Sequence, residues 1–509
     1  MEHMGKTMFA AAILACAGLL LAQPAMASSE VGLLAQQRSS EVGLLAQQRS
    51  KVLQTAGDYF RDPQGRLVFL RGVNVSGDSK VPPFVPLHSR EESGQVDFSQ
   101  LDPLPRWGFN TIRLLFTWEA YEPEPGHFNE EYLQQITRLA DEAWARGIYV
   151  VLDMHQDAYS KYLSDGCGEG FPAWTVPAHY RRPNNRTLKP CGSLWVVGRM
   201  LSPDMHHSYQ RFYADRDGAR SAFLALWSRL AHHFSTHPGV IGYDLLNEPW
   251  GGERSELAPL YRDLARVIRK QDPTSILFIE PQTFMTVFGF KRSHLPKPEF
   301  SNFAFAPHFY DPMTMALNSW AHWRAGIAHH GFRLMVEKAR ELHAPLFVGE
   351  FGVVGGTHNG RAFSDYQYDQ LDGNFVSGAQ WNYTPAWTPE GRDGWNHEDL
   401  SIVNGSGELR DSFHPRPFAR ALSGAPVSQR ELRLSDGTLS KYTLEWKQLV
   451  PGGDTSVFVP AEILDHPELY ELQSSGPGLS CVREDAALGI RCGATAPGDM
   501  KFWISRRPI

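Results

Sequence analysis

Eight short apolar runs, separated by helix-forming segments, recur along most of the chain. They lie at residues 67–74, 110–118, 148–155, 240–248, 276–282, 303–310, 345–352 and 378–384. Between them, stretches such as 130–147, 255–272 and 332–343 have apolar residues at helical spacing. Near-continuous apolar strands joined by helices indicate parallel strands that are buried on both faces. The pattern predicts an α/β fold, a (β/α)8 TIM barrel, which we place at residues 55–425.

The last part of the chain has a different pattern. After residue 425 the helix-forming segments end, and short strand-like runs joined by turns follow. This pattern predicts a small C-terminal β-sandwich domain at residues 426–509. A chain of 509 residues is long enough for one large domain and a smaller one.

The N-terminus has the features of an export signal. Lys6 precedes an apolar run at 8–22, and the small residues Ala25 and Ala27 follow. We expect a cleavable signal peptide at residues 1–27, and therefore a secreted or periplasmic protein. A lipoprotein signal at Cys16 is disfavoured, because apolar residues continue past it. No later run is long and apolar enough to span a bilayer, so we expect no transmembrane segment in the mature chain.

A short exact repeat follows the expected signal. The segment SSEVGLLAQQR at 28–38 occurs again, letter for letter, at 39–49. We interpret residues 28–54 as a flexible leader that contains a recent tandem duplication, in preference to a functional amphipathic anchor.

Four cysteines remain after the signal: Cys167, Cys191, Cys481 and Cys492. An even number in an exported chain suggests two disulfides, and three pairings are conceivable. We favour the local pairs, Cys167 with Cys191 and Cys481 with Cys492, over free buried thiols. We expect no metal site, since the chain has no C-x-x-C and its histidine pairs are adjacent in sequence.

The charge of the chain argues against one class of partner. The formal net charge is -7, and no basic stripe is visible. We therefore expect no nucleic-acid partner.

Two glutamates end apolar runs of the predicted barrel. Glu248 ends the run at 240–248, and Glu350 lies near the end of the run at 345–352. The carboxyl ends of barrel strands form the active face, and a buried carboxylate is costly unless it has a function. A structural ion pair would explain either glutamate alone. Both together are what glycoside hydrolysis needs, one as proton donor and one as nucleophile.

The motifs around these glutamates resemble a known family. NEP at 247–249 and GEFG at 349–352 are similar to glycoside hydrolase family 5. The resemblance implies that Glu248 is the general acid/base and Glu350 the nucleophile of a retaining enzyme, with carboxyl groups about 5–5.5 Å apart. It also implies that Arg113 pairs with the nucleophile and that Asn247 contacts the sugar 2-hydroxyl.

Further residues match positions of the same family. His308 and Tyr310, in PHFY, match its H-x-Y motif, with the tyrosine bonded to the nucleophile. Trp381, on the eighth run, matches the aromatic platform beneath the sugar.

A narrower resemblance concerns the substrate. RGVNVSGDSK at 71–80, LDMHQDAYS at 152–160 and the NEP segment are similar to endoglycoceramidases and related glycosylceramidases. In that group a lysine and an HQD triplet grip the first sugar, which implies this role for Lys80, His155 and Asp157. The resemblance implies a glycosphingolipid substrate, transient contact with a lipid or membrane surface, and hydrolysis by water with no cofactor. We expect a monomer.

Two questions stay open at the sequence level. The aromatic segments 171–177, 193–197 and 284–290 either line an apolar groove for ceramide or pack the insertions onto the barrel. The alternative functions are a β-glucanase or sterol-glucoside hydrolase with the same catalytic residues, and an inactive carbohydrate- or lipid-binding protein.

Overall fold

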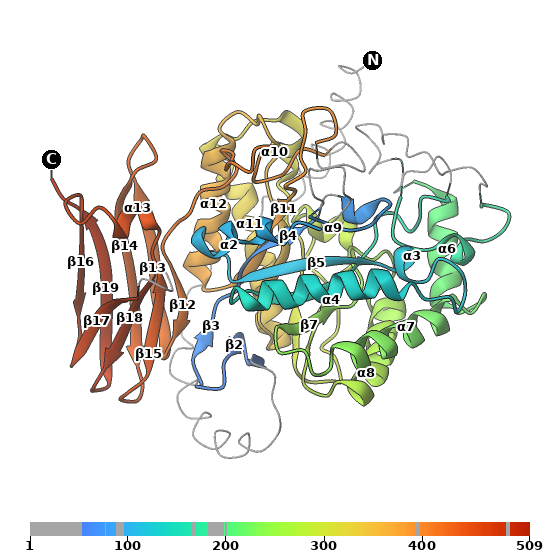
Figure 1. The fold of residues 1–509 in the computed structure, drawn as a ribbon, viewed down its shortest axis with the longest axis horizontal. Helices are drawn as coiled ribbons and strands as arrows, with labels where there is room; N and C mark the ends of the chain where they lie inside the picture. Colours follow the sequence, from blue (N-terminus) through green and yellow to red (C-terminus); the bar gives the residue numbers. More distant parts are fainter. Residues whose placement is uncertain are drawn as a thin grey trace.

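The computed structural model describes residues 53–76, 78–87, 96–163, 168–181, 198, 201–392, 398–484 and 489–508. It has two parts, a barrel of strands and helices and an all-β part that carries the C-terminus (Figure 1). The predicted signal peptide and leader, with the repeat, lie outside the described residues apart from the leader's last two, as do Cys167 and Cys191.

The predicted barrel is confirmed. Eight strands of the described chain form one sheet in the order β10-β11-β4-β5-β6-β7-β8-β9, and every pair is parallel. Isolated parallel bridges from Phe305 to Leu346 and from Phe309 to Phe351 bring the two ends of the sheet together. The strands are β4 (Arg71–Val75), β5 (Thr111–Thr117), β6 (Tyr149–His155), β7 (Val240–Asp244), β8 (Ile276–Ile279), β9 (Phe303–Phe305), β10 (Phe347–Phe351) and β11 (Ser377–Tyr383).

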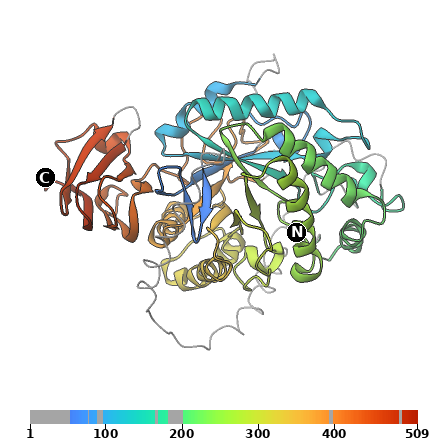
Figure 2. The same ribbon diagram turned by 90° about the horizontal axis from the view of Figure 1, so that it is seen from below.

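Helices surround the barrel strands (Figure 2). Their apolar residues recur every three or four positions and face the sheet, as in α8, where Leu260, Leu264 and Ile268 are buried. The barrel helices are α2 (Pro103–Arg106), α3 (Trp118–Tyr121), α4 (Glu130–Ala145), α6 (Pro203–Tyr213), α7 (Ala219–Phe234), α8 (Ala258–Gln271), α9 (Thr283–Val287), α10 (Pro312–Leu317), α11 (Ala325–Leu342) and α12 (Gly360–Asn374). Short 3-10 helices are η1 (Asp78–Lys80), η2 (Phe98–Leu101), η3 (Ala173–Thr175) and η5 (His322–Arg324), and a π-helix is η4 (Glu253–Leu257).

The C-terminal part consists of antiparallel sheets that enclose their own core, as predicted. Trp446, Tyr442 and Phe502 are among its buried residues. One sheet has the order β1-β2-β3-β12-β15-β18-β17, and the other β13-β14-β19-β16. The elements are β1 (Gln54–Ala56), β2 (Tyr59–Arg61), β3 (Leu67–Val68), β12 (Phe418–Leu422), β13 (Gly424–Arg433), β14 (Leu439–Gln448), β15 (Asp454–Phe458), α13 (Ala461–Leu464), β16 (Tyr470–Ser475), β17 (Leu479–Glu484), β18 (Gly489–Ala494) and β19 (Gly498–Arg506).

The two parts share strands in a way that the sequence pattern does not indicate. The run at 67–74 is divided between β3, which pairs with β12 in the C-terminal sheet, and β4, which opens the barrel. β12 itself begins at Phe418, before residue 426, where we placed the domain boundary. β1, β2 and β3 are too short to show the two-residue period of a strand in the sequence, so their place in the C-terminal sheet was not predicted.

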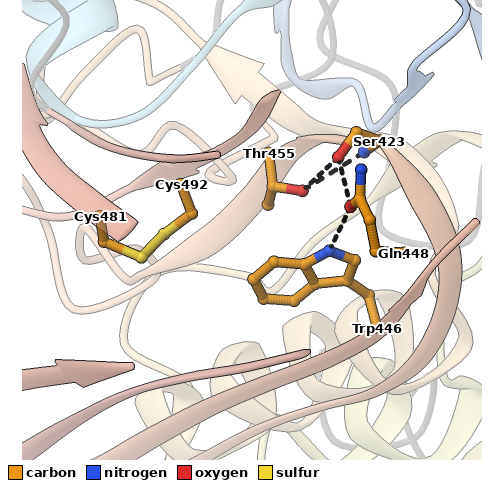
Figure 3. Close-up of a disulfide and its surroundings, with 6 residues drawn as sticks. All are labelled: Ser423, Trp446, Gln448, Thr455, Cys481 and Cys492. Atoms are coloured by element: carbon orange, nitrogen blue, oxygen red, sulfur yellow. Dashed lines mark hydrogen bonds between the residues drawn. A yellow bond between two sulfur atoms is a disulfide. The ribbon is translucent and has the colours of Figure 1, made fainter. Parts of the chain in front are cut away.

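The predicted disulfide between Cys481 and Cys492 is present (Figure 3). It joins β17 to β18, where the two cysteines are direct cross-strand partners. Next to it, the buried Trp446 indole nitrogen donates to Gln448 Oε1 at 3.1 Å, and Ser423 Oγ donates to the same atom at 2.8 Å. Among the described residues, no helix is both long and apolar enough to span a bilayer.

Removing this disulfide should destabilise the C-terminal part. The bridge closes a short loop, with a sequence separation of 11 residues. The chain-entropy relation for a loop of that size gives about 3 kcal/mol. A Cys481→Ser, Cys492→Ser double variant should therefore melt at a lower temperature in calorimetry, and the wild type in reductant should behave like it. Equal melting temperatures with and without the bridge would contradict this expectation.

Candidate active site

The two predicted catalytic glutamates lie at the carboxyl end of the barrel. Glu350 belongs to β10, as expected. Glu248 lies beyond β7, which ends at Asp244 rather than at 248 as the apolar run suggested. Its backbone is left-handed, with φ 41°, a conformation uncommon outside glycine. Neighbouring side chains hold this turn: Glu280 Oε2 accepts from the Glu248 N–H at 2.8 Å, and Gln156 Nε2 donates to the Glu248 carbonyl at 3.1 Å.

His308 lies between the two carboxyl groups. Its Nδ1 is 2.9 Å from Glu248 Oε1 and 3.5 Å from Glu350 Oε2. One oxygen of each glutamate and a ring nitrogen of His308 all lie within 4.8 Å of one another. The Tyr310 hydroxyl donates to Glu350 Oε2 at 3.0 Å. This close spacing suits a retaining glycosidase, whose carboxyl groups are about 5–5.5 Å apart, better than an inverting one at about 6.5–9.5 Å.

The Arg113 guanidinium connects Glu350 to the middle of the barrel. The side chain is fully buried on β5 and forms ion pairs of 2.8–3.0 Å with four carboxyl groups. Burial opposes its charge, but the acids together raise its pKa well above the usual value. Its partners are Asp153, Asp244, Glu280 and Glu350, and it also donates to the amide oxygens of Asn74 and Asn247.

Glu248 and Asp244 retain protons more readily than ordinary carboxylic acids. Burial is the main cause of the raised pKa of Glu248; the charge of Glu350 adds to it, and His308 opposes it. Burial likewise raises the pKa of Asp244 well above its usual range, although Arg113 opposes the shift. A raised pKa is what a general acid needs, because it must carry its proton at the start of the reaction.

The residues predicted to grip the sugar form a second cluster. Lys80 Nζ lies 2.5 Å from Asp157 Oδ2 and 4.5 Å from the centre of the Trp381 ring. The His155 ring stacks on the same indole, with centroids 5.4 Å apart and planes 11° apart. His155 Nδ1 lies 2.6 Å from Asp153, which also binds Arg113. The two clusters are therefore joined through one aspartate.

Residues of both clusters line one cavity of about 150 Å³. Its charged and polar lining residues are Lys80, Asp157, Glu248, Thr283, Tyr310, Glu350, Trp381 and Glu398, and its apolar ones are Ala158, Trp250, Phe284, Val287, Phe288, Met315 and Leu400. Asn247 is not among them: its side chain is buried and bonds to Arg113 and to the Gln156 carbonyl.

Three apolar lining residues form a continuous aromatic row. Trp250 stacks on Phe284 with centroids 6.1 Å apart, and Phe284 contacts Phe288 edge to face at 6.2 Å. Of the three aromatic segments considered above, 284–290 therefore lines the cavity. Segment 171–177 instead packs against the barrel, where Phe171 contacts Trp118. Segment 193–197 lies outside the described residues.

Several residues of the site were missed by the sequence argument. Glu280 follows the apolar run of β8, the same signal that identified Glu248, and could have been found from it. Asp153 and Asp244 stand inside apolar strands, which is a weaker form of that signal. Glu398, whose Oε2 accepts from the Trp381 indole N–H at 3.2 Å, lies in a loop with no motif.

Three groups of acids and histidines in the described chain come close enough to hold a cation. They are His155, Asp157 and Glu169; Glu248, His308 and Glu350; and Asp153, Asp244 and Glu280. Each already faces a cation of the protein, Lys80 in the first group and Arg113 in the other two. A cation of the protein therefore already lies against each group.

Loss of Arg113 should cost much of the stability of the barrel. An Arg113→Met variant leaves four carboxyl groups buried around an apolar side chain. Breaking a buried ion pair from one side typically costs about 3–5 kcal/mol. Denaturant unfolding should show a loss of this size, whereas Arg333→Met, which removes an exposed pair with Glu337 on α11, should change stability by less than about 1 kcal/mol. Equal losses in the two variants would contradict the central role of Arg113.

The chain is similar to known glycosidases in sequence. The family model described as cellulase (glycosyl hydrolase family 5) matches residues 99–386. Endoglycoceramidase I of Rhodococcus hoagii is 31% identical over 276 residues, which are 51% of this chain and 52% of that protein. An endoglycoceramidase of Cyanea nozakii is 28% identical over 354 residues, 63% of this chain and 67% of that protein.

A solved structure has the same fold. Endo-glycoceramidase II from Rhodococcus sp. superimposes with a TM-score of 0.69 at 20% identity, over 88% of this chain and 100% of that one. The alignment with endoglycoceramidase I spans about half the length of that relative. The family model covers more than half of the present chain and includes both glutamates. This chain belongs to glycosyl hydrolase family 5.

Proposed function

We propose that this protein is a retaining β-glycosidase that hydrolyses the linkage between glycan and ceramide in glycosphingolipids. The observation that carries the proposal is the lining of one cavity: two close carboxyl groups, a charged cluster around Trp381, and an aromatic row. A glycolipid needs all three, a reaction centre, a polar site for sugar hydroxyls and an apolar site for the lipid. The endoglycoceramidase names of the relatives agree with this substrate class.

In the proposed reaction Glu350 attacks the anomeric carbon while Glu248 protonates the ceramide oxygen. The bond between the anomeric carbon and that oxygen breaks, and a covalent glycosyl-enzyme forms. Glu248, now ionised, takes a proton from water, which attacks the anomeric carbon and releases Glu350. The hydrogen bonds of Glu350 to Arg113 and Tyr310 hold its carboxyl group in place and orient the attacking oxygen.

The polar part of the cavity suits the first sugar. Lys80 donates, Asp157 and Glu398 accept, and the Trp381 ring lies beside the Lys80 ammonium group. Charged donors and acceptors that are already oriented fix sugar hydroxyls at a small entropic cost. His155, behind this group, would act by holding Trp381 and Asp153 in place.

The aromatic row distinguishes between the alternatives. Trp250, Phe284 and Phe288 suit a lipid leaving group better than the sugar that leaves in a β-glucanase, because two phenyl rings offer no partners for the hydroxyls of a second sugar. A sterol-glucoside hydrolase would use such a row, and remains the second candidate. The close carboxyl pair and the raised pKa of Glu248 argue against an inactive binding protein.

The remaining parts of the proposal come from the sequence. The segment at 1–27 supports export to the periplasm or the medium, and a lipid substrate implies transient contact with a membrane surface or micelle. We propose a monomer that works with water and without a cofactor.

Variants of the two glutamates should separate their roles. Glu350→Gln should reduce kcat on the order of a thousandfold or more with every substrate, because no nucleophile remains. Glu248→Gln should lower kcat/KM strongly for ceramide release but much less for an activated aryl glycoside, since an acidic leaving group needs no proton in the first step, which kcat/KM reports. Steady-state kinetics on both substrates test this, and equal losses of Glu248→Gln on the two would contradict the acid role.

The acid role of Glu248 also predicts a pH dependence. The reaction needs Glu248 protonated, and burial raises its pKa. We therefore expect kcat/KM of the wild type to persist above the ordinary range of a carboxylic acid and to fall as pH rises through the raised pKa. In Glu248→Gln the part of this fall that comes from Glu248 itself should be absent for the activated aryl glycoside.

A substrate panel tests the lipid assignment. The mature protein should hydrolyse a ganglioside or glucosylceramide in detergent, and release of an intact oligosaccharide would identify the endo mode. A Phe284→Ser, Phe288→Ser variant should raise KM for glycolipids on the order of tenfold or more through lost apolar burial, while KM for a short aryl glycoside changes little. Activity confined to a soluble cello-oligosaccharide would refute the lipid assignment, and preference for a sterol glucoside would favour the second candidate.

A further inference from the structure

Glu169 is fixed behind the sugar-gripping cluster by its own backbone. It lies opposite Asp157: the Asp157 N–H donates to the Glu169 carbonyl at 3.1 Å, and the Glu169 N–H donates to the Asp157 carbonyl at 2.8 Å. Glycines flank it on both sides. A Cβ on Gly168 would lie 2.7 Å from the Ser160 carbonyl, and one on Gly170, whose φ is 103°, would lie 2.4 Å from Gln156 Cβ. The G-E-G sequence thus lets the loop approach closely and leaves Glu169 no room to turn away.

The Glu169 carboxyl group is buried without hydrogen bonds. Its residue is 1% exposed, and within the described residues neither oxygen has a hydrogen-bond partner. Two cationic groups face its Oε1, His155 Nε2 at 3.5 Å and Lys80 Nζ at 3.9 Å. A buried ionised carboxyl group without donors is costly. Burial raises the pKa of Glu169 to about 8, although His155 and Lys80 oppose the shift, so this group carries a proton at neutral pH.

The charged groups around Glu169 come from several elements. Lys80 comes from η1, His155 and Asp153 from β6, and Asp157 from the turn after β6. Burial opposes the charge on His155, yet Asp153 and Asp157 raise its pKa to about 10. Lys80 and His155 thus face Asp157 and Asp153; Glu398 also acts on Lys80, and Arg113 also binds Asp153. The phenol of Tyr132, on α4, also senses Glu169; burial raises the pKa of this phenol, so it stays neutral.

We propose that Glu169 is a positioning residue for the sugar site. While Glu169 is neutral, the Lys80 ammonium group stays paired with Asp157 at the cavity. When Glu169 is ionised, it attracts this ammonium group away from the cavity. Lys80 already lies 3.9 Å from Glu169 Oε1, so a small movement of a flexible side chain suffices. Lys80 and Asp157 line the cavity, whereas Glu169 does not. Ionisation of Glu169 therefore weakens sugar binding without contact with the sugar. The inference rests on the proposed function, because it assigns the sugar to this cluster.

The test is the pH dependence of sugar binding. Calorimetry measures Kd of a soluble thio-linked β-glucoside, which is not hydrolysed, between pH 6 and pH 9.5 for the wild type and Glu169→Gln. The wild-type Kd should rise on the order of fivefold between pH 8 and pH 9, as expected when the ionised form does not bind. Glu169→Gln mimics the neutral acid, so its Kd should match the wild type at pH 6 and stay flat. A control, Glu119→Gln, removes another buried acid of this region, paired with Lys161, and should keep the wild-type profile.

A second readout measures the ionisation of Glu169 itself. Its pKa in the folded protein lies above the ordinary value of 4.5, so the folded state holds a proton that the unfolded state has lost. The wild-type melting temperature should therefore fall relative to that of Glu169→Gln as pH rises from about 5 to about 8, and the difference should level off above that.

The outcomes separate this inference from the proposed function. A wild type that binds the thioglucoside with a Kd independent of pH, or a Glu169→Gln variant whose Kd rises in parallel with the wild type, overturns the role of Glu169 alone. A wild type that neither binds nor hydrolyses any β-glycoside overturns the proposed function, and this inference with it.

Discussion

The structure depends on one buried cation. The Arg113 guanidinium stands inside the barrel and binds acids that reach it from β6, β7, β10 and the end of β8. One positive charge does not neutralise four ionised acids buried at this depth, and bound protons compensate for part of the difference. Burial raises the pKa of Asp244. Glu280 and Glu350 raise the pKa of His308 well above its usual value, against the effect of burial. A similar response occurs in many catalytic sites, where pairs of titratable groups are pushed apart in pKa by their surroundings.

The proposed reaction centre and the proposed sugar site are one electrostatic system. Asp153 binds Arg113 with one oxygen and His155 with the other, and His155 stacks on Trp381. From there the charges continue through Lys80 and Asp157 to Glu169. Any change of charge at one end is therefore felt along a chain of buried contacts, where solvent does not screen it. This arrangement explains why both ends hold acids that are partly or wholly protonated.

Much of the fold was predictable because the barrel strands carry their signal locally. All eight apolar runs became strands, and Glu248 and Glu350 were found because an acid that ends an apolar strand is costly unless it is used. The rest has no local signal. β1, β2 and β3 are two or three residues long, and their partners lie in β12 and in one another. Glu169 and Glu398 come from loops. They join the site only because the chain folds back, and no periodic pattern in the sequence indicates such a fold. The predicted end of β7 was also wrong. The strand ends at Asp244, because the chain turns at Glu248, whose carbonyl accepts from Gln156 and whose N–H donates to Glu280.

The pairing of β3 with β12 has a consequence for the order in which the protein is made. β3 immediately precedes the first barrel strand, and Leu67 pairs with Leu422, near the far end of the chain. As the chain emerges from the ribosome, β3 can pair with β2, but its other neighbour, β12, is synthesised only after the whole barrel. Contacts between residues so distant in sequence form slowly, because loop closure precedes any gain. The first barrel strand thus remains anchored to an incomplete sheet during synthesis, which favours a loosely folded chain until the last strands arrive.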